Sequence, residues 1–256
     1  MTPGAVWGIA MVKDEADIVR ATVGNMIRQV DYVLVADNGS TDGTRELLAT
    51  MDVMVLDDPE VGYYQSRKMT ALAAHAADKG AAWVVPFDAD EWWYSPFGRI
   101  AEVLRGLPPE VGRVSAPLFD HVATGADPGG PDPVARTPWR RREPGKFPKV
   151  ACRPLLPATI DQGSHGVTYA LDDAPGQLVV RHFPYRSAEQ FVRKVRNGAA
   201  AYAAAEDLPE SAGRHWRNYG EILEHRGPEA VADIFREWFW VADPEAKPGL
   251  VHDPAP

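Results

Sequence analysis

The first ninety residues alternate short apolar runs with amphipathic segments of helical length, and this alternation strongly constrains the fold. We predict strands over residues 6–12, 32–36, 53–56 and 81–86, with helices over 14–30, 45–51 and 64–79 between them. Strands that alternate with helices imply a parallel sheet built through right-handed crossovers. The predicted fold class is therefore α/β, with a mostly parallel sheet flanked by helices.

Acidic residues gather directly after the fourth predicted strand, at Asp88, Asp90 and Glu91. Like charges this close resist joint ionisation. A divalent cation would remove that cost, because Mg²⁺ and Mn²⁺ prefer oxygen ligands and often bridge carboxylates to substrate phosphates. In an extended segment Asp88 and Asp90 point to the same side. The pattern predicts that these two carboxylates share Mn²⁺ or Mg²⁺; the alternative is a turn with solvated acids.

Polar residues also follow the second predicted strand, at Asp37 and Asn38. Ligands of parallel sheets bind outside the carboxyl ends of the strands, so we expect these residues on the same rim as Asp88. A carboxylate there can accept hydrogen bonds from a ribose or a base, which predicts a nucleotide site. The alternative is a strand-to-helix turn with a good N-cap. Arg67, near the start of the next helix, faces either this rim or solvent.

Three segments, in order and at matching spacing, resemble family 2 glycosyltransferases. Residues 9–17 resemble the family's first strand and turn, with Asp14 where Asn is common, and residues 35–44 resemble its D-x-S-x-D-x-T segment. Asp88-Ala89-Asp90-Glu91 resembles its D-x-D motif, in the D-x-D-E form of a branch with short catalytic domains. The resemblance implies a GT-A fold, a nucleoside diphosphate sugar donor and a divalent metal. It places Asp37 at the nucleobase or ribose, Asp88 near the ribose and metal, and Asp90 on the metal.

The segment from 136 to 153 is basic although the chain carries a net charge of −9. Such a reversal can attract a diphosphate or an anionic acceptor; the alternative is a solvated loop. Lys149 and Arg153 are the better nucleotide ligands in it. Two histidines follow, His165 and His182. GT-A enzymes often add a histidine to the metal shell, so the resemblance favours His182 as a third metal ligand and His165 on the acceptor side, although the two roles can be exchanged.

The family's usual catalytic base has no clear match in this chain. An inverting transfer needs a base that deprotonates the acceptor hydroxyl. Glu91, Asp120 and Asp161 are the available acids, and Asp161 or His165 can serve; spacing does not choose, so inversion is an expectation. We predict a metal-dependent glycosyltransferase of the hexosyltransferase type that moves one sugar to an acceptor hydroxyl. The alternatives are a sugar-phosphate nucleotidyltransferase and a non-catalytic nucleotide-sugar-binding relative.

The carboxyl-terminal part is predicted to be helical. We expect a catalytic domain over 1–186, with a nucleotide-binding half (1–95) and an acceptor half (96–186), and a subdomain of helices and tail over 187–256. Ser187 is a candidate cap for the first of these helices. An apolar stripe at helical spacing is predicted to be core: Val231, Ile234, Phe235, Trp238 and Phe239.

The composition of the chain limits which partners and which cellular compartment we expect. The acidic net charge of −9 argues against nucleic-acid binding. Cys152 is the only cysteine, so no internal disulfide forms. We see no signal peptide and no apolar run near the roughly 20 residues that span a bilayer, so we expect a cytoplasmic location. The expected partners are a nucleoside diphosphate sugar donor and a small-molecule or glycan acceptor; a dimer stays open.

Overall fold

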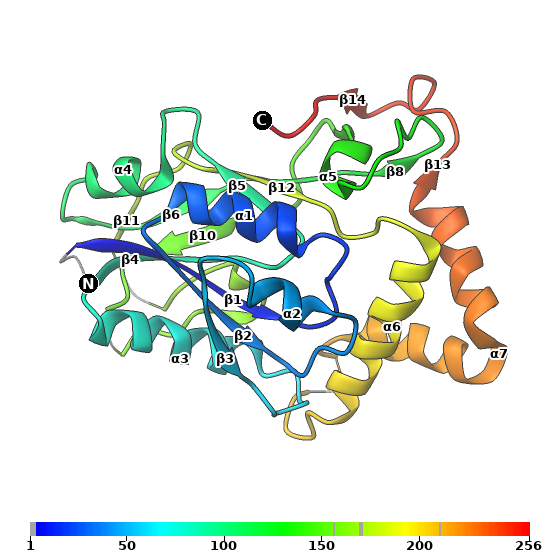
Figure 1. Cartoon of the computed structure of the whole chain (residues 1–256), viewed down its shortest axis with the longest axis horizontal. Coiled ribbons are helices and arrows are strands. Elements are labelled where there is room, and N and C mark those ends of the chain that lie inside the picture. Colours follow the sequence, from blue (N-terminus) through cyan, green and yellow to red (C-terminus); the bar gives the residue numbers. More distant parts are fainter. Residues whose placement is uncertain (1–3, 156, 169–170, 210) are drawn as a thin grey trace.

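The computed structural model describes residues 4–155, 157–168, 171–209 and 211–256 (Figure 1). Its main sheet has seven strands in the order β11-β6-β10-β4-β1-β2-β3. The four strands of the amino-terminal half are parallel: β1 (Ala5–Val12), β2 (Tyr32–Asp37), β3 (Met54–Asp57) and β4 (Ala81–Pro86). The other three are β6 (Val111–Ala116), β10 (Lys149–Cys152), which is antiparallel to β4 and β6, and β11 (Asp172–Asp173). The predicted α/β class with a mostly parallel sheet is confirmed.

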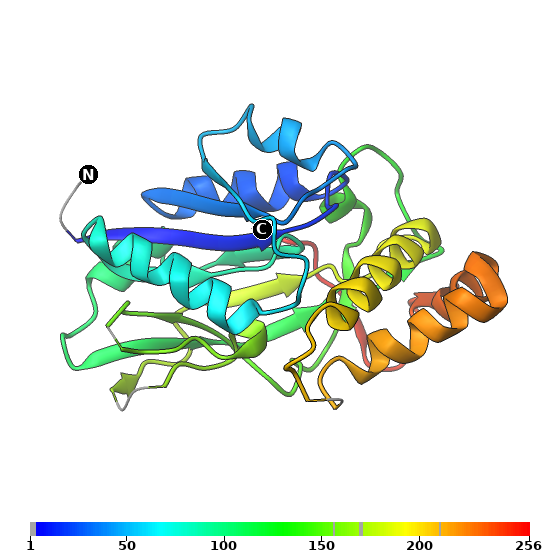
Figure 2. The ribbon, with the colours of Figure 1, turned by 90° about the horizontal axis from the view of Figure 1, so that it is seen from below.

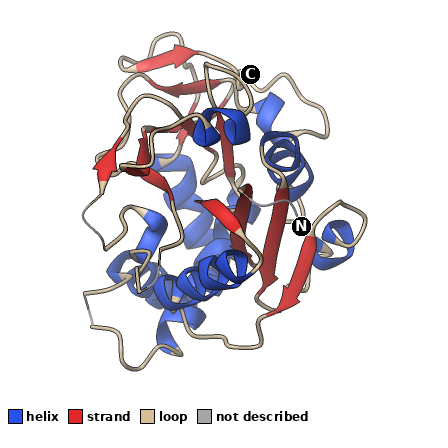
Figure 3. Cartoon of the chain, turned by 90° about the vertical axis from the view of Figure 1, so that its left-hand side faces the viewer, coloured by secondary structure: helices blue, strands red, loops and turns tan. Residues whose placement is uncertain are grey.

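Helices cover both faces of this sheet because alternate residues of its strands enter opposite cores. Ala10 and Val12 of β1 pack in the core that faces α1, whereas Trp7 and Ile9 pack in the core that faces α3. Figure 2 shows α1 and α3 on opposite sides of β1, and Figure 3 shows strands enclosed between helices. The helices of this half are α1 (Val19–Gln29), α2 (Thr44–Leu48), α3 (Gln65–Asp78) and α4 (Ile100–Arg105).

A three-stranded sheet continues directly from the acidic motif. Its order is β5-β12-β7, formed by β5 (Glu91–Tyr94), β12 (Val179–His182) and β7 (Leu118–Asp120). Glu91 pairs with His182 in this sheet, so the motif and the second histidine become neighbours. The chain passes from β6 to β7 at Pro117, whose missing N–H cannot continue a ladder.

The carboxyl-terminal tail pairs with strands from the middle of the sequence. β13 (Trp240–Val241) pairs with β8 (Ala123–Thr124), and β14 (Leu250–His252) pairs with β9 (Trp139–Arg141). Between β8 and β9 lies the short helix α5 (Pro133–Arg136). A short 3₁₀ turn, η1 (Gln162–Ser164), precedes β11.

The two carboxyl-terminal helices lie together beyond the carboxyl end of β1 (Figure 1). α6 (Ala188–Ala203) begins at Ser187, whose side chain accepts a hydrogen bond from the Gln190 N–H, as predicted. α7 (Arg214–Trp238) is interrupted at Gly227, whose backbone is not helical. Val231 and Phe235 are buried, but Trp238 is 69% exposed, so its predicted burial is wrong. No helix of the described residues combines the length and apolar character needed to cross a membrane.

The first helix begins later than predicted, at Val19 rather than after Asp14. Asp14 has a left-handed backbone (φ 53°). Its carboxylate accepts hydrogen bonds from the Thr41 N–H (2.7 Å) and the Asn197 side chain (2.8 Å). Asp14 therefore joins the β1–α1 loop to the β2–α2 loop and to α6.

Candidate active site

A cleft of about 420 Å³ opens at the carboxyl edge of the main sheet, a size in the range of small-molecule sites. The ends of β1, β2 and β4 form one side of it, and α6 with the start of α7 forms the other. The sheet contributes Lys13, Asn38, Asp88 and Asp90, and the helices contribute Lys194 and Trp216. Residues from both ends of the chain therefore face one space.

Asp88 lies in this cleft and is held by two side chains. Its Oδ1 accepts a hydrogen bond from Gln65 Nε2 (3.0 Å), and its Oδ2 accepts one from Lys149 Nζ (2.6 Å). Lys149 reaches this rim because β10 runs antiparallel to β4, so the first residue of β10 lies beside the end of β4. Burial lowers the pKa of Lys149, but the carboxylates of Asp88 and Glu91 outweigh burial and raise it.

Glu91 is fully buried behind the motif and does not reach the cleft. Its Oε1 lies 2.7 Å from Lys149 Nζ. Its Oε2 accepts hydrogen bonds from the Asp88 N–H (3.1 Å) and from Trp93 Nε1 (3.0 Å). Burial raises the pKa of Glu91 more than the Lys149 ammonium lowers it. The contacts make Glu91 a brace for the motif, which corrects its expected catalytic role.

Asp90 lies in the cleft between two cationic groups. Its Oδ2 accepts a hydrogen bond from Lys194 Nζ, and its Oδ1 lies 3.7 Å from His182 Nε2. His182 Nδ1 lies 2.8 Å from Asp120 Oδ1. Burial lowers the pKa of His182, but the two carboxylates outweigh burial and raise it to about 10. The two carboxylates favour the imidazolium form of His182 in this arrangement, and its expected role as a metal ligand stays a prediction.

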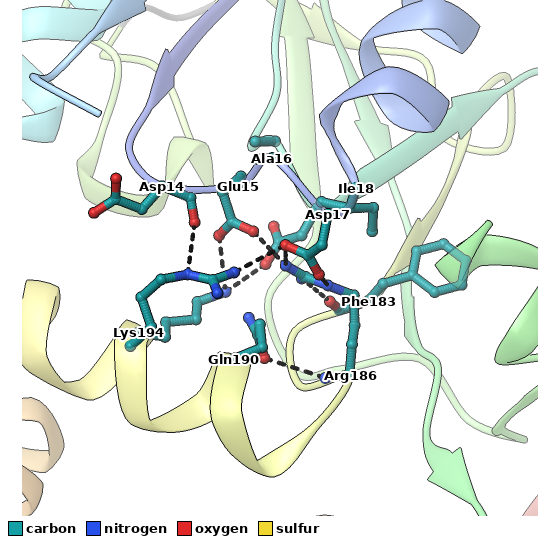
Figure 4. Close-up of polar contacts among 12 residues, drawn as sticks. Asp14, Glu15, Ala16, Asp17, Ile18, Phe183, Arg186, Gln190 and Lys194 are labelled. Carbon is teal, nitrogen blue, oxygen red and sulfur yellow. Dashed lines mark hydrogen bonds and ion pairs between the residues drawn. The ribbon is translucent and has the colours of Figure 1, made fainter. Parts of the chain in front are cut away.

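An ion-pair network fixes α6 against the β1–α1 loop (Figure 4). Arg186 pairs with Glu15, and its Nε lies 2.7 Å from Asp17 Oδ2. Arg193 lies 3.0 Å from Asp17 Oδ1, and Lys194 lies 3.9 Å from Glu15 Oε1. Because Arg186 is nearly buried, these pairs are screened less by salt than surface pairs. The network therefore holds the cationic face of α6 over the ends of the parallel strands.

The carboxylates of Asp88 and Asp90 fit a hard divalent cation by their chemistry. Each already holds a cationic group, Lys149 on Asp88 and Lys194 on Asp90. Within the ranges that the structure describes, no three His, Cys, Asp or Glu side chains form a complete metal site. Mg²⁺ often takes only one or two carboxylates and completes its shell with water and substrate phosphates. The pair therefore suits a metal that binds together with a phosphorylated ligand.

The predicted nucleotide residues on β2 lie at the rim but differ in access. Asn38 lines the cleft, and its Nδ2 donates to Asp58 Oδ2 (2.9 Å) and to the Glu60 carbonyl (2.6 Å). Asp37 is buried behind it, with its Oδ2 3.7 Å from Arg45. The two predicted polar clusters thus share one edge of the sheet, and Asn38 is the member of the β2 pair that faces the cleft.

Three predicted site residues lie away from the cleft. Arg67 is 63% exposed and pairs with Glu60 at 2.5 Å. Arg153 follows β10 at the opposite edge of the sheet, where its guanidinium lies 4.6 Å from the centre of the Trp83 ring. Asp161 is exposed on the turn before β11. None of these three residues lines the cleft, and their expected roles stay predictions.

His165 is the predicted catalytic candidate that lines the cleft. Its Nδ1 lies 2.9 Å from the Pro148 carbonyl. A carbonyl only accepts, so Nδ1 carries the proton and Nε2 of the neutral ring holds the lone pair. Burial lowers the pKa of His165 below its usual 6.5, more than that hydrogen bond raises it. His165 is therefore a neutral base at physiological pH.

Sequence reasoning missed the contribution of α6 to the site. Gln190, Lys194, Asn197 and Ala201 all line the cleft and recur at the spacing of one helix face. That periodicity was a usable signal for a shared face. Only the packing of α6 on the β1–α1 loop shows that this face meets Asp90.

Residues 9–107 match the sequence profile of glycosyl transferase family 2. This amino-terminal part of the chain is therefore similar to family 2 glycosyltransferases. The matched part extends from β1 beyond α4 and contains Asp37, Asp88 and Asp90. The cleft histidines His165, His182 and His215 and the whole of α6 follow the matched residues. No curated protein sequence matches the chain.

Solved glycosyltransferase structures overlap the chain in part. The mannosyltransferase PcManGT from Pyrobaculum calidifontis, in complex with GDP-Man and Mn²⁺, is 20% identical, with 93% of this chain and 75% of that chain covered and a TM-score of 0.44. Mannosyl-3-phosphoglycerate synthase from Rubrobacter xylanophilus is 21% identical over 59% of this chain and 53% of that one, with a TM-score of 0.32. Glucosyl-3-phosphoglycerate synthase from Mycobacterium tuberculosis is 15% identical over 44% of each chain, with a TM-score of 0.30.

Proposed function

We propose that this glycosyltransferase is metal-dependent and moves one sugar from a nucleoside diphosphate donor to the hydroxyl of a small-molecule or glycan acceptor. The main supporting observation is that Asp88 and Asp90 share one cleft with Asn38. Carboxylates at the end of β4 suit a cation, and polar groups at the end of β2 suit a nucleoside. The cationic face of α6 closes the same space and suits the phosphates of the donor.

Asp88 and Asp90 are the proposed metal ligands. A divalent cation bound there would stabilise the negative charge that develops on the departing diphosphate. Asn38 and Lys13 line the part of the cleft above β1 and β2, where we place the nucleoside. Lys13 Nζ donates to the carbonyls of Asn38 (2.7 Å) and Gly39 (3.2 Å), so it keeps the β2–α2 loop in place beside the donor.

His165 is the proposed general base. Its neutral ring lines the cleft and its Nε2 has a lone pair. As the acceptor oxygen attacks the anomeric carbon, the hydroxyl proton passes to His165 Nε2. The bond between that carbon and the diphosphate oxygen breaks, and the bonding electrons leave with the diphosphate. A single displacement of this kind inverts the anomeric configuration, so inversion is part of the proposal.

Calorimetric titration with GDP, UDP, dTDP, ADP and CDP, each with and without Mn²⁺, tests the donor class. We expect one diphosphate to bind with clear metal dependence. Lack of binding by all five would contradict the proposal. Tight binding without transfer or hydrolysis of the matching sugar donor would indicate a non-catalytic relative. Release of pyrophosphate from a nucleoside triphosphate and a sugar phosphate would indicate a nucleotidyltransferase.

Asp90→Asn tests the metal ligand. Loss of the carboxylate charge is expected to abolish metal-dependent transfer while the protein remains folded by circular dichroism, because Asn keeps the shape of the side chain. Asp57→Asn is the matched control, since Asp57 ends strand β3 of the same sheet and its side chain is 80% exposed. Full activity and unchanged metal dependence in Asp90→Asn would refute the assignment.

A further inference from the structure

We propose that the Lys194 ammonium pairs with Asp90 until a divalent cation replaces it. This replacement is favourable chiefly when the cation binds together with a diphosphate. This inference rests on the proposed function but concerns a residue outside the family match. Lys194 lies on α6, 104 positions after Asp90. Its role would be to make binding of the metal and binding of the donor depend on each other.

The first reason for this role of Lys194 is that it limits access to Asp90 from the cleft. The Asp90 side chain is only 4% exposed. Lys194 Nζ covers Oδ2, and His182 Nε2 lies 3.7 Å from Oδ1. The Lys194 side chain is 24% exposed and lines the cleft. A cation that enters from the cleft therefore meets the Lys194 ammonium before it reaches Asp90, and the two positive charges compete for one carboxylate.

The second reason is that other hydrogen-bond acceptors lie close to Lys194 and can replace Asp90 as its partner. Lys194 Nζ lies 3.9 Å from Glu15 Oε1 and 3.3 Å from the Pro184 carbonyl. An ammonium has three donors, so a small movement off Asp90 leaves Lys194 partnered and inside the cleft. Arg186 keeps α6 on the β1–α1 loop through Glu15 and Asp17 during such a movement. The exchange thus needs one side chain to move and no change in the fold.

Lys149, whose ammonium pairs with Asp88, differs from Lys194 in its position relative to the cleft. Its side chain is buried and lies between Asp88 (2.6 Å) and Glu91 (2.7 Å). It lies behind the rim rather than in the cleft, so it can keep its partners while Asp88 meets a ligand from the other side. Lys194 is therefore the ammonium whose displacement exposes a carboxylate to the cleft.

Coupling between the metal and the diphosphate follows from this geometry. A cation alone leaves the Lys194 ammonium close to another positive charge, which is unfavourable. A diphosphate supplies anionic oxygens that accept hydrogen bonds from the released ammonium. The diphosphate should therefore raise the affinity for the metal, and by linkage the metal should raise the affinity for the diphosphate by the same factor.

Mn²⁺ titration of the diphosphate-free protein, followed by electron paramagnetic resonance of free Mn²⁺, tests the competition directly. Lys194→Met should bind Mn²⁺ about tenfold more tightly than the wild type or better, because a unit charge about 4 Å away interacts strongly at a protein rim. Lys194→Arg, which keeps the charge, should bind Mn²⁺ as weakly as the wild type. Lys194→Gln is the second neutral variant and carries the test if the Met variant does not fold.

Arg193→Met is the matched control on the same helix. Arg193 pairs with Asp17 and donates to the Asp14 carbonyl (3.1 Å), so its loss removes one positive charge without uncovering Asp90. We expect Arg193→Met to change Mn²⁺ affinity by less than about threefold, since its charge is already paired at a partly exposed site. Equal tightening in Arg193→Met and Lys194→Met would overturn the inference, as would a Lys194→Met variant that binds Mn²⁺ no more tightly than the wild type.

Repetition of the titrations with GDP and with UDP tests the coupling. In the wild type the diphosphate that binds should increase Mn²⁺ affinity, and in Lys194→Met this increase should be clearly smaller. An equal increase in both proteins would overturn the coupling role. If neither GDP nor UDP nor any other nucleoside diphosphate bound, the proposed function would fail, whereas the Mn²⁺ comparison without diphosphate would still decide whether Lys194 guards Asp90.

Discussion

Replacement of Lys149 by methionine is expected to lower the free energy of unfolding by about 3–5 kcal/mol at neutral pH, the usual cost of removing one partner of a buried ion pair. Methionine is close to lysine in length and keeps the packing, but it carries no charge. Glu91 has no exposed surface and loses the ammonium that lay 2.7 Å from its Oε1. Asp88 lies at the cleft and can regain water, so most of the cost comes from Glu91.

The double variant Lys149→Met/Glu91→Gln separates this cause from a loss of packing. Glutamine keeps the shape of Glu91 and removes the charge that needs compensation. The double variant should therefore be more stable than the sum of the two single changes predicts, as expected for residues in direct contact. Lys146→Met is the matched control, because Lys146 is exposed in the same segment and surface changes usually stay within about 0.5 kcal/mol.

The destabilisation should also depend on pH. Burial raises the pKa of Glu91, and the Lys149 ammonium opposes that rise. Without Lys149 the pKa of Glu91 in the folded protein should rise further above that of the unfolded chain. A carboxyl group of this kind contributes stability that is lost as the pH rises through its folded pKa. Lys149→Met should therefore be closer to the wild type in stability at pH 5 than at pH 7.

Urea unfolding followed by the fluorescence of the eight tryptophans provides the measurement. The midpoints give the difference in stability, provided that the slopes agree between variants. The reasoning is refuted if Lys149→Met stays within about 1 kcal/mol of the wild type, far below the cost for a buried pair. Strict additivity in the double variant, or a destabilisation that does not change between pH 5 and pH 7, would refute the attribution to Glu91.

Two histidines give further predictions. Burial lowers the pKa of His121 from 6.5 to about 4, more than its 2.5 Å hydrogen bond to the Thr137 carbonyl raises it. Between these two pKa values the unfolded chain binds more protons than the folded protein, so the free energy of unfolding should fall by up to about 3 kcal/mol as the pH drops through this window. His121→Asn should lose less stability over the same pH range. An equal dependence of stability on pH in the variant and the wild type would contradict this. His165→Gln should lower kcat by about 10²–10⁴, the usual range for a general base, whereas the exposed His225→Gln control should not. The wild-type rate should decline only below pH 6.5, because the pKa of His165 is lowered, and a decline that persists in His165→Gln would exclude this base.

Features that depend on neighbouring residues were predictable from the sequence. The apolar run before Asp88 predicted β4 with its observed ends, because a buried strand of parallel sheet reads as a continuous apolar segment. The Ser187 cap was predictable for the same reason, since a cap needs only a side-chain oxygen and the N–H groups that follow it. Such signals lie within a few residues of each other, and their geometry follows from the local backbone.

Strand direction was decided only by the tertiary structure. Lys149 and Arg153 lie in one basic segment and were equal candidates for the nucleotide site. β10 runs antiparallel to β4, so Lys149 lies at the cleft edge beside Asp88 and Arg153 lies at the opposite edge of the sheet. No local pattern encodes which way a strand enters a sheet, because pairing depends on a distant partner.

The sequence by itself determined the α/β class, the order of the amino-terminal strands and the carboxylates that end β4. It also determined the family resemblance, because all of these are properties of contiguous segments. The tertiary structure alone decided which charges meet these carboxylates: Lys149 on Asp88, and Lys194 on Asp90 across 104 positions. Charge interactions act through space and not along the chain, so the cations of this site became known only when the sheet and α6 were packed together.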